Sequence, residues 1–433
     1  MKTSLHTKRQ QGYLDFLSGI ICLTIYEERD INFINISPEQ AIVRSLLVHE
    51  ITHLMDLYTT AWGIEYVFRK NCAYMGRGKP DYQQRLSVFM LNTAEIESHE
   101  NLKKTHSEVS LNEASQINHA LVYDQRFGSM IIVNYVADNK IIHQTPLSML
   151  SLLEAHATSE EFLSRINDAK ISTCNPIVGD KIIQQDFKNL LGDRELSEYS
   201  LLLFLTQLHF KEFLTFEQIP RLVSSLSRIA LDFSAISCVS FGRFISDKFQ
   251  NIEIGDNICL DLSRGMSRPI VFFKTILLMY DWLKTCSDEK RDVVLNTLKV
   301  EPSEAIVEFF NVIGIYYDNK INDVEFQSYL KFLLEEESSI PDGTYAKEIT
   351  IGNRVLLTDS CLADCFFKIS IPPILLGDDA ELFLGNTVAK DHMVFVKNNL
   401  DIYTQLDSLY RENEHNKSHL PLGDGLDFFR AQQ

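Results

Sequence analysis

The residues best suited to do chemistry occupy positions 49–53, which read His-Glu-Ile-Thr-His. Helix positions four apart lie on one face, one turn apart, so the imidazoles of His49 and His53 can bind the same metal ion. The helical period rotates Glu50 by about 100° from His49, which places its carboxylate beside the metal. A carboxylate there can accept a proton from a water that the metal has acidified. The spacing therefore predicts metal-dependent hydrolysis with Glu50 as general base.

The residues around this motif predict a long amphipathic helix. Residues 37–40 read Ser-Pro-Glu-Gln, which matches a helix start with a capping box and a proline in the first turn. Apolar residues then recur at helical spacing from Ile42 to Leu57. We expect the helix to end near Tyr58 and to resume over residues 62–70. The apolar flanks disfavour the alternative of a helix with two surface histidines.

A second helix supplies the candidate third metal ligand. It is predicted to start at Thr145-Pro146 and to run to about Ile166, with apolar residues nearly all round. Glu154 lies within this apolar stretch, where a lone carboxylate is destabilising unless it is paired or bound to a metal. We therefore predict Glu154 as a ligand. The alternative is an ion pair with a buried arginine such as Arg44 or Arg126.

Other residues compete for roles at this site. Asp56 is an alternative ligand, or an acceptor for an imidazole N–H group, and Glu161 shares the ligand face of its helix. A stabiliser for the oxyanion is also needed, and four residues qualify by type without a preference among them: Tyr123, Tyr135, His143 and His156. Three histidines of a polar segment are interpreted as surface residues: His99, His106 and His119.

The His-Glu-x-x-His helix resembles that of the zincin metallopeptidases. No glycine or histidine follows His53 where the metzincin branch places its third ligand. In gluzincins that ligand is a glutamate on a later helix, commonly in a Glu-x-x-Ala stretch, and residues 154–157 read Glu-Ala-His-Ala. The resemblance covers about the first 170 residues. It implies Zn2+ held by His49, His53 and Glu154, and a peptide or protein substrate.

The remaining pattern indicates an α+β fold: a zincin-like N-terminal domain with a small sheet and the HExxH helix, then a mostly α-helical C-terminal region. Strands are expected within residues 17–35 and over Met130–Ala137, with Lys140–His143 as a hairpin partner. Met130–Ala137 is also a candidate edge strand for an extended peptide, or else a core strand. Helical patterns dominate after residue 175, although Ala346–Thr358 looks strand-like.

The predicted domains are residues 1–175, with a polar insertion at residues 92–118, and residues 190–433. The second domain is a candidate for substrate recognition.

Composition limits the partners and the location. The chain has 433 residues and a formal net charge of -18, which disfavours nucleic acid. No apolar run is long enough to span a membrane. The eight cysteines are scattered, which is typical of reduced thiols in a cytoplasmic protein. Cys361 and Cys365 form a C-x3-C pair without a matching second pair.

These features together predict a cytoplasmic zinc metallopeptidase. The alternative is a non-catalytic interaction or regulatory protein with a structural metal site. Glu50 favours the enzyme, because a structural site has no use for a general base beside an open coordination position.

Overall fold

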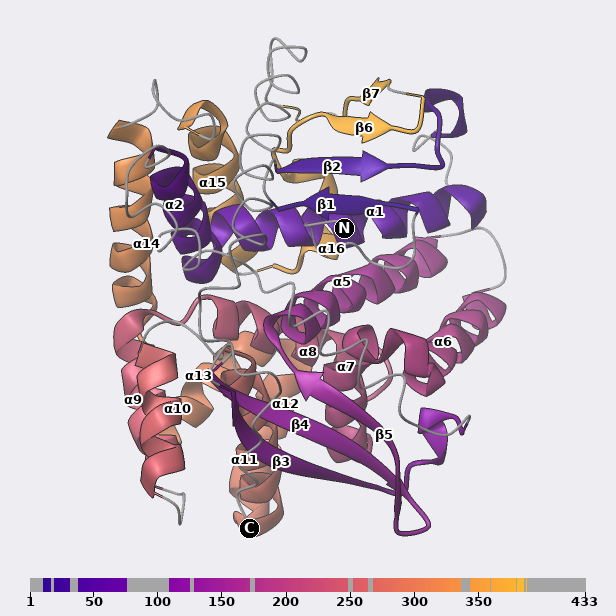
Figure 1. Ribbon diagram of the computed structural model, residues 1–433. Helices are drawn as coiled ribbons and strands as arrows, with labels where there is room; N and C mark the ends of the chain where they lie inside the picture. The colour runs from indigo at the N-terminus through magenta and orange to yellow at the C-terminus, as the bar shows by residue number, and fades with distance from the viewer. Residues whose placement is uncertain are drawn as a thin grey trace, which may run out of the picture. The chain divides into compact units, whose positions relative to one another are not determined.

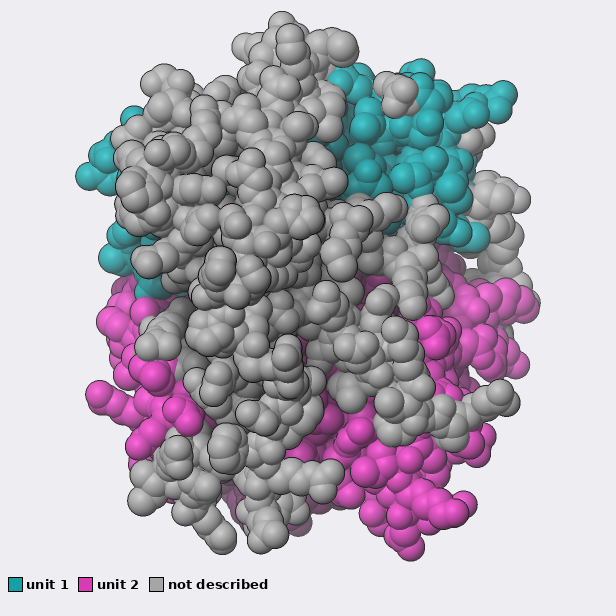
Figure 2. Space-filling model, in the orientation of Figure 1, with its two compact units in different colours: residues 1–93, 322–422 teal, residues 94–321, 423–433 magenta. Residues whose placement is uncertain are grey.

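The computed structural model describes residues 11–16, 19–31, 38–75, 109–124, 128–171, 176–247, 252–263, 268–335, 343–358, 360–378, 380–384 and 387. The chain divides into two compact units (Figure 2). Unit 1 comprises residues 1–93 and 322–422, and unit 2 comprises residues 94–321 and 423–433. The boundary expected between residues 175 and 190 falls inside unit 2, on a continuous helix, α6 (Pro176–Gly192).

The sheet of unit 1 joins both ends of the described chain (Figure 1). Its strand order is β1-β2-β6-β7, with β2 parallel to β6 and the other neighbours antiparallel. The four strands are β1 (Tyr13–Asp15), β2 (Ile20–Leu23), β6 (Ile374–Leu376) and β7 (Glu381–Leu382). β2 confirms the clearest part of the predicted N-terminal strand region. Its parallel partner lies some 350 residues away in sequence, a pairing that no local pattern indicates.

The predicted long helix is present as α1 (Pro38–Thr59), followed by α2 (Ala61–Met75). The chain turns between them, and the hydroxyl of Thr60 accepts the backbone N–H of Gly63 at 3.0 Å. A Cβ at residue 63 would overlap the backbone oxygens of Asp56 and Leu57, so this turn requires glycine. α1 packs against β1 and β2 on the sheet and against α2, α15 and α16.

The C-terminal part of unit 1 is helical where one strand was expected. The prediction of a strand over Ala346–Thr358 is wrong, because these residues belong to helix α15. Its β-branched residues favour strands locally, but the buried positions 349, 350, 353, 354 and 357 follow the helical period. The helices of this part are α14 (Asn319–Glu335), α15 (Gly343–Thr358), α16 (Leu362–Cys365) and the 3-10 turn η4 (Phe366–Lys368).

Unit 2 contains an antiparallel three-stranded sheet in the order β3-β4-β5. Its strands are β3 (Gln116–Asp124), β4 (Gly128–Ala137) and β5 (Lys140–Leu147). Asp138 and Asn139 join β4 to β5 with φ angles of 48° and 60°, the left-handed pair that a tight hairpin needs. The hairpin is thus confirmed. Of the two alternatives for Met130–Ala137, edge strand or core strand, the structure shows the core strand, because β4 is central and is paired on both sides.

Part of the predicted polar insertion is also regular structure. Residues 92–108 lie outside the described residues, whereas β3 already begins at Gln116. The second predicted helix is α5 (Met149–Ile171), and it begins later than expected because Pro146 pairs within β5.

Helices make up most of unit 2, and α5 packs against α6, α7, α8 and α11. The helices after α6 are α7 (Ser197–Phe210), α8 (Gln218–Leu231), α9 (Ala235–Ser246), α10 (Ile252–Ser263), α11 (Arg268–Thr285), α12 (Asp288–Val300) and α13 (Pro302–Ile313). Unit 2 also has the short 3-10 turns η2 (Leu111–Glu113) and η3 (Arg194–Leu196), whereas η1 (Glu28–Asp30) belongs to unit 1. Within this unit, four buried rings form what we call the aromatic cluster: Phe233, Phe241, Phe310 and Tyr317.

The expected α+β class is confirmed: the protein is mostly helical with small sheets. In the described part of the chain, no single helix combines the length and apolar composition that a membrane span requires; only the pair α8 and α9, bent by 108°, meets that test jointly. The six cysteines that the structure describes are free thiols.

Candidate metal centre

The two histidines of the motif lie on the buried face of α1. His49 is 5% exposed and His53 is 3% exposed. Their ring centroids are 4.9 Å apart with an angle of 85° between the ring planes. Adjacent turns of one helix thus hold both imidazoles together, as the four-residue spacing predicts. Glu50, between them in sequence, is only 1% exposed.

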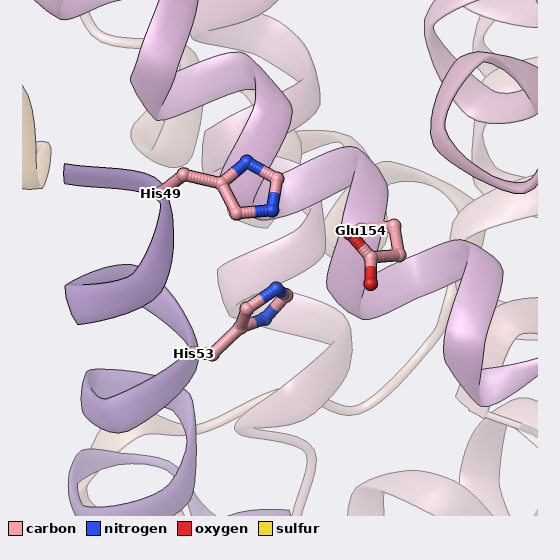
Figure 3. A group of neighbouring side chains, drawn as sticks. All are labelled: His49, His53 and Glu154. Carbon is pink, nitrogen blue, oxygen red and sulfur yellow. The ribbon is translucent and has the colours of Figure 1, made fainter. Parts of the chain in front are cut away.

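Glu154 completes a group of three potential ligands. One ligand atom each from His49, His53 and Glu154 lies within 4.8 Å of the other two. In Figure 3 the two rings from α1 and the carboxylate from α5 point toward one another. Glu154 itself is 2% exposed. Among the described residues, this is the group of histidine, cysteine and acidic side chains that could hold a metal ion.

The chemistry of the three donors suits a metal ion and, among metals, zinc. Two imidazole nitrogens and one carboxylate oxygen are a ligand set that catalytic zinc sites use, with a fourth position open. Donors bound to one zinc ion at ~2 Å lie within roughly 4 Å of one another. A buried carboxylate is strongly destabilising without compensation, and a divalent cation provides it.

Aromatic packing supports the ligand helix on the side of His53. The ring of Phe16, just after β1, lies 5.9 Å from the ring of His53. Phe16 in turn contacts Tyr66 of α2 edge-on at 6.4 Å, and Tyr66 lies 5.8 Å from Trp62. This stack limits how far the His53 ring can rotate, because its neighbours are themselves packed.

Hydrogen bonds anchor the beginning of α5, which carries Glu154. The hydroxyl of Ser151 donates to the carbonyl of Pro146 at 3.1 Å, and the backbone N–H of Ser151 donates to the hydroxyl of Ser148 at 3.3 Å. Both serines are buried. The first turn of the helix is thereby tied to the end of β5, one turn before the glutamate.

The β1–β2 hairpin lies beside the candidate general base. A Cβ added at Gly12 would stand 2.9 Å from a methyl of Leu23, which would have to shift, and 3.5 Å from Cγ of Glu50, an ordinary van der Waals contact. Burial raises the pKa of the Cys22 thiol to about 11, against a hydrogen bond from Tyr13 that lowers it; the charges of Asp15 and Glu50 raise it further. Cys22 is therefore a protonated neighbour of Glu50 at neutral pH.

The competing ligands fall outside this group. Asp56 is fully buried on α1, and Glu161 is half-buried on α5, but neither belongs to the three. The guanidinium of Arg44 lies 4.8 Å from the ring of Phe367 and 5.5 Å from that of Phe366. Arg126, His99 and His106 are outside the described residues.

The candidate oxyanion stabilisers are buried where their side chains are described. Tyr135 and His143 are register partners on β4 and β5 with ring centroids 5.8 Å apart. Burial raises the pKa of Tyr135 well above its usual range, and Phe204 packs against its ring at 5.2 Å. His156 is buried on α5, and the side chain of Tyr123 is outside the described residues. The structure favours none of Tyr135, His143 and His156 over the others as the oxyanion stabiliser.

His119 differs from its predicted surface position. Its Nε2 lies 3.5 Å from Nζ of Lys274, and its ring contacts Phe273 at 5.0 Å. Burial lowers its pKa to about 4, and the positive charge of Lys274 lowers it further. His119 is therefore half-buried on β3, with Lys274 and Phe273 of α11 against its ring, and is not a fully exposed surface histidine.

The C-x3-C pair of cysteines is engaged locally. The thiol of Cys361 donates to the carboxylate of Asp364 at 3.0 Å, and the thiol of Cys365 donates to the carbonyl of Cys361 at 3.4 Å. Both contacts join the short helix α16 to Cys361, the residue directly before it.

Two supports of the site were not predicted from the sequence, namely Phe16 and Gly12. Neither lies in a pattern that signals a contact with α1, because both follow from the fold of the β1–β2 hairpin.

Comparison with known proteins identifies no family for this chain: no protein-family model, no curated protein and no solved structure matches it.

Proposed function

We propose that the protein is a zinc-dependent peptidase of the zincin type. His49, His53 and Glu154 hold the metal, and Glu50 is the general base. One observation carries this proposal: the His-Glu-x-x-His motif and a glutamate from a separate helix place their ligand atoms within 4.8 Å of one another, all buried. A His-His-Glu set leaves the fourth position of a tetrahedral ion for water or substrate.

The role of each group in the proposed reaction follows from its chemistry. Zinc, when bound, supplies Lewis-acid chemistry that lowers the pKa of a water molecule to near neutrality. Glu50 accepts a proton from the attacking water and returns it to the nitrogen that leaves. Peptide hydrolysis thus adds one water across the C–N bond, giving a carboxylic acid and an amine. The burial of Glu50 excludes bulk water from this transfer.

The substrate class follows from the resemblance and from charge. Zincins hydrolyse peptide bonds, so a peptide or protein is the expected substrate. A formal net charge of -18 disfavours nucleic acid as a partner. The scattered cysteines favour a cytoplasmic location.

Metal content tests the ligand set. Wild type, His49→Ala and Glu154→Gln are purified without added metal and analysed for zinc by elemental analysis. We expect about one zinc per chain in the wild type and a loss in both variants, because each removes one of three protein donors. His156→Ala and Glu160→Gln are matched controls: both alter buried residues of α5, and both are expected to keep zinc.

The outcomes separate the ligands from the function. Zinc retained in Glu154→Gln would remove Glu154 as the third ligand and direct attention to Asp56. A wild type that takes up no zinc, even after incubation with it, would overturn the proposal.

Cleavage of a peptide library, read by mass spectrometry, tests the activity. Wild type is compared with Glu50→Gln, which retains the ligands but lacks the base. Products that appear only with wild type support a peptidase. A zinc-loaded wild type that cleaves nothing in the library and whose zinc is closed by a fourth protein ligand would favour the structural-site alternative.

A further inference from the structure

The C-terminal end of α1, the helix that carries His49 and His53, is bound by an arginine far away in sequence. Arg354 of α15 is 9% exposed, and its Nη1 donates to the carbonyl of Thr59 at 2.6 Å. Thr59 is the last residue of α1. The last carbonyls of a helix lack partners within it and carry partial negative charge. A buried cation that donates to one of them is therefore both a cap and a favourable charge.

The guanidinium itself is held from two further sides. Its Nε donates to the carboxylate of Asp323 at 3.1 Å, and its plane lies 3.9 Å from the ring centroid of Phe326. Both partners belong to α14. Three directions of contact fix this side chain in one conformation, so the position of the Thr59 carbonyl is fixed with it.

Local hydroxyls complete the cap. The hydroxyl of Thr59 donates to the carbonyl of Met55, and that of Thr60 donates to the carbonyl of Asp56, both at 2.6 Å. The carbonyls of Met55, Asp56 and Thr59 therefore each accept a side-chain donor. This turn begins two residues after His53, so its geometry is transmitted directly to the ligand.

The other end of the helix contacts the same C-terminal segment. Arg44, five residues before His49, places its guanidinium 4.8 Å from the ring centroid of Phe367 in η4. The segment Gly343–Lys368, which contains α15, α16 and η4, thus contacts α1 on both sides of the histidine pair.

We propose that this segment positions the metal ligands, with Arg354 as its principal positioning residue. The inference rests on the proposed metal-binding function of His49 and His53. Arg354 does not touch the ligands; it acts by holding the helical turn next to His53. Residues that orient metal ligands typically change metal affinity by 10- to 100-fold when they are altered. We expect the lower end of that range because Arg354 acts through the backbone.

Titration with Co2+ tests the proposal, since its visible absorption reports ligand geometry as well as affinity. Full-length wild type, Arg354→Met and Arg354→Lys are compared. We expect Arg354→Met to bind Co2+ about 10-fold more weakly with an altered visible spectrum. Arg354→Lys retains a cation at the helix end and should recover part of the affinity. A purely structural role would lower the unfolding temperature without changing the spectrum of the bound ion.

Arg165→Met is the matched control. Arg165 also pairs with an aspartate, Asp186, and lies over a phenylalanine ring, that of Phe162, and neither of these partners belongs to α1. The affinity of the Arg165→Met variant for Co2+ should stay within twofold of that of the wild type. An equal loss of affinity in Arg165→Met and Arg354→Met would overturn the positioning role.

Two further results decide the remaining cases. If the wild type binds no Co2+ or Zn2+, the proposed function fails and this inference falls with it. If the wild type binds and Arg354→Met matches it in affinity and spectrum, the positioning role alone is overturned. Should Arg354→Met not fold, Arg354→Lys and Phe367→Leu replace it; Phe367 is 58% exposed, so its truncation is mild. Wild-type affinity and spectrum in both would contradict the proposal.

Discussion

Helix α1 of unit 1 and the aromatic cluster of unit 2 are equally buried, but they bury different kinds of side chain. Within eight residues, α1 buries four titratable side chains: His49, Glu50, His53 and Asp56. The aromatic cluster buries Phe233, Phe241 and Phe310 completely, with ring centroids 5.6–6.4 Å apart. Tyr317 closes this cluster at 5.2 Å from Phe233.

Under the proposed function, burial serves stability in the aromatic cluster and chemistry on α1. A buried phenylalanine contributes roughly 1.5–3 kcal/mol through the removal of apolar surface from water. A buried histidine or carboxylate is unfavourable unless it is hydrogen-bonded, paired or bound to a metal. The proposed metal-binding and catalytic role of α1 would account for the burial of four titratable side chains on one helix. Substitutions on α1 should therefore change catalysis or zinc binding, whereas substitutions in the aromatic cluster should change stability.

The largest effect is expected for Glu50→Gln. If α1 is the catalytic region, this variant should hydrolyse peptides ~10²–10⁴-fold more slowly, because it cannot accept the proton. The zinc content should equal that of the wild type, since Glu50 is not a predicted ligand. The measurement is the initial rate on any peptide that the wild type cleaves. Activity close to wild type would remove Glu50 as the base.

The converse effect is expected for Phe310→Ala in the aromatic cluster. Loss of the ring should lower the free energy of unfolding by ~3–5 kcal/mol because a cavity is left in a closely packed region. Zinc affinity of the folded fraction should not change. Urea unfolding followed by circular dichroism measures the first quantity, and Phe310→Leu is the milder control. Zinc affinity that falls with stability would contradict the separation of the two regions.

Zinc itself should stabilise only a protein with an intact ligand set. At a free zinc concentration of about 100 times Kd, wild type should gain roughly 2.7 kcal/mol. His49→Ala should show little of this gain, whereas His156→Ala should show it in full. Thermal unfolding with zinc and with a chelator makes the comparison. An equal gain in His49→Ala would indicate zinc binding elsewhere.

The smallest effect concerns His119, a half-buried histidine outside the metal group. The pKa of His119 is about 4 in the folded protein, below its ordinary value of 6.5. The unfolded chain therefore binds the proton more readily, and stability should fall as the pH drops from 6.5 toward 4. His119→Gln should reduce this loss by about 1 kcal/mol after allowance for solvent screening. Urea midpoints at pH 7 and pH 5 test it; identical pH dependence in both proteins would show that His119 is not the group that titrates.

Features that depend on short stretches of chain were predictable. The helix around His49 and His53, the hairpin of β4 and β5 and most helices of unit 2 follow from residues close in sequence, because helical periods and tight turns are local. Glu154 was identified as a candidate ligand because a carboxylate in an apolar helix needs compensation.

Features that depend on pairing between segments distant in sequence were not predictable in this way. The β-branched residues of Ala346–Thr358 indicate a strand locally, yet burial against α1 favours the helix α15. The sequence left open whether β4 is an edge strand or a core strand, and only its pairing with β3 decides this. His119 lies in a polar stretch that indicates exposure, but Lys274 and Phe273 of α11 contact its ring and leave it half-buried.

The sequence by itself therefore determined the chemistry that is available: two imidazoles one helical turn apart, a carboxylate between them and a second carboxylate in an apolar helix. Only the tertiary structure decided which donors meet and what holds them, namely Glu154 beside the histidines, Phe16 on His53 and Arg354 on the last carbonyl of α1. The physical reason is that helical spacing is set by backbone hydrogen bonds between neighbours. Contacts between distant segments arise only from the collective burial of apolar surface.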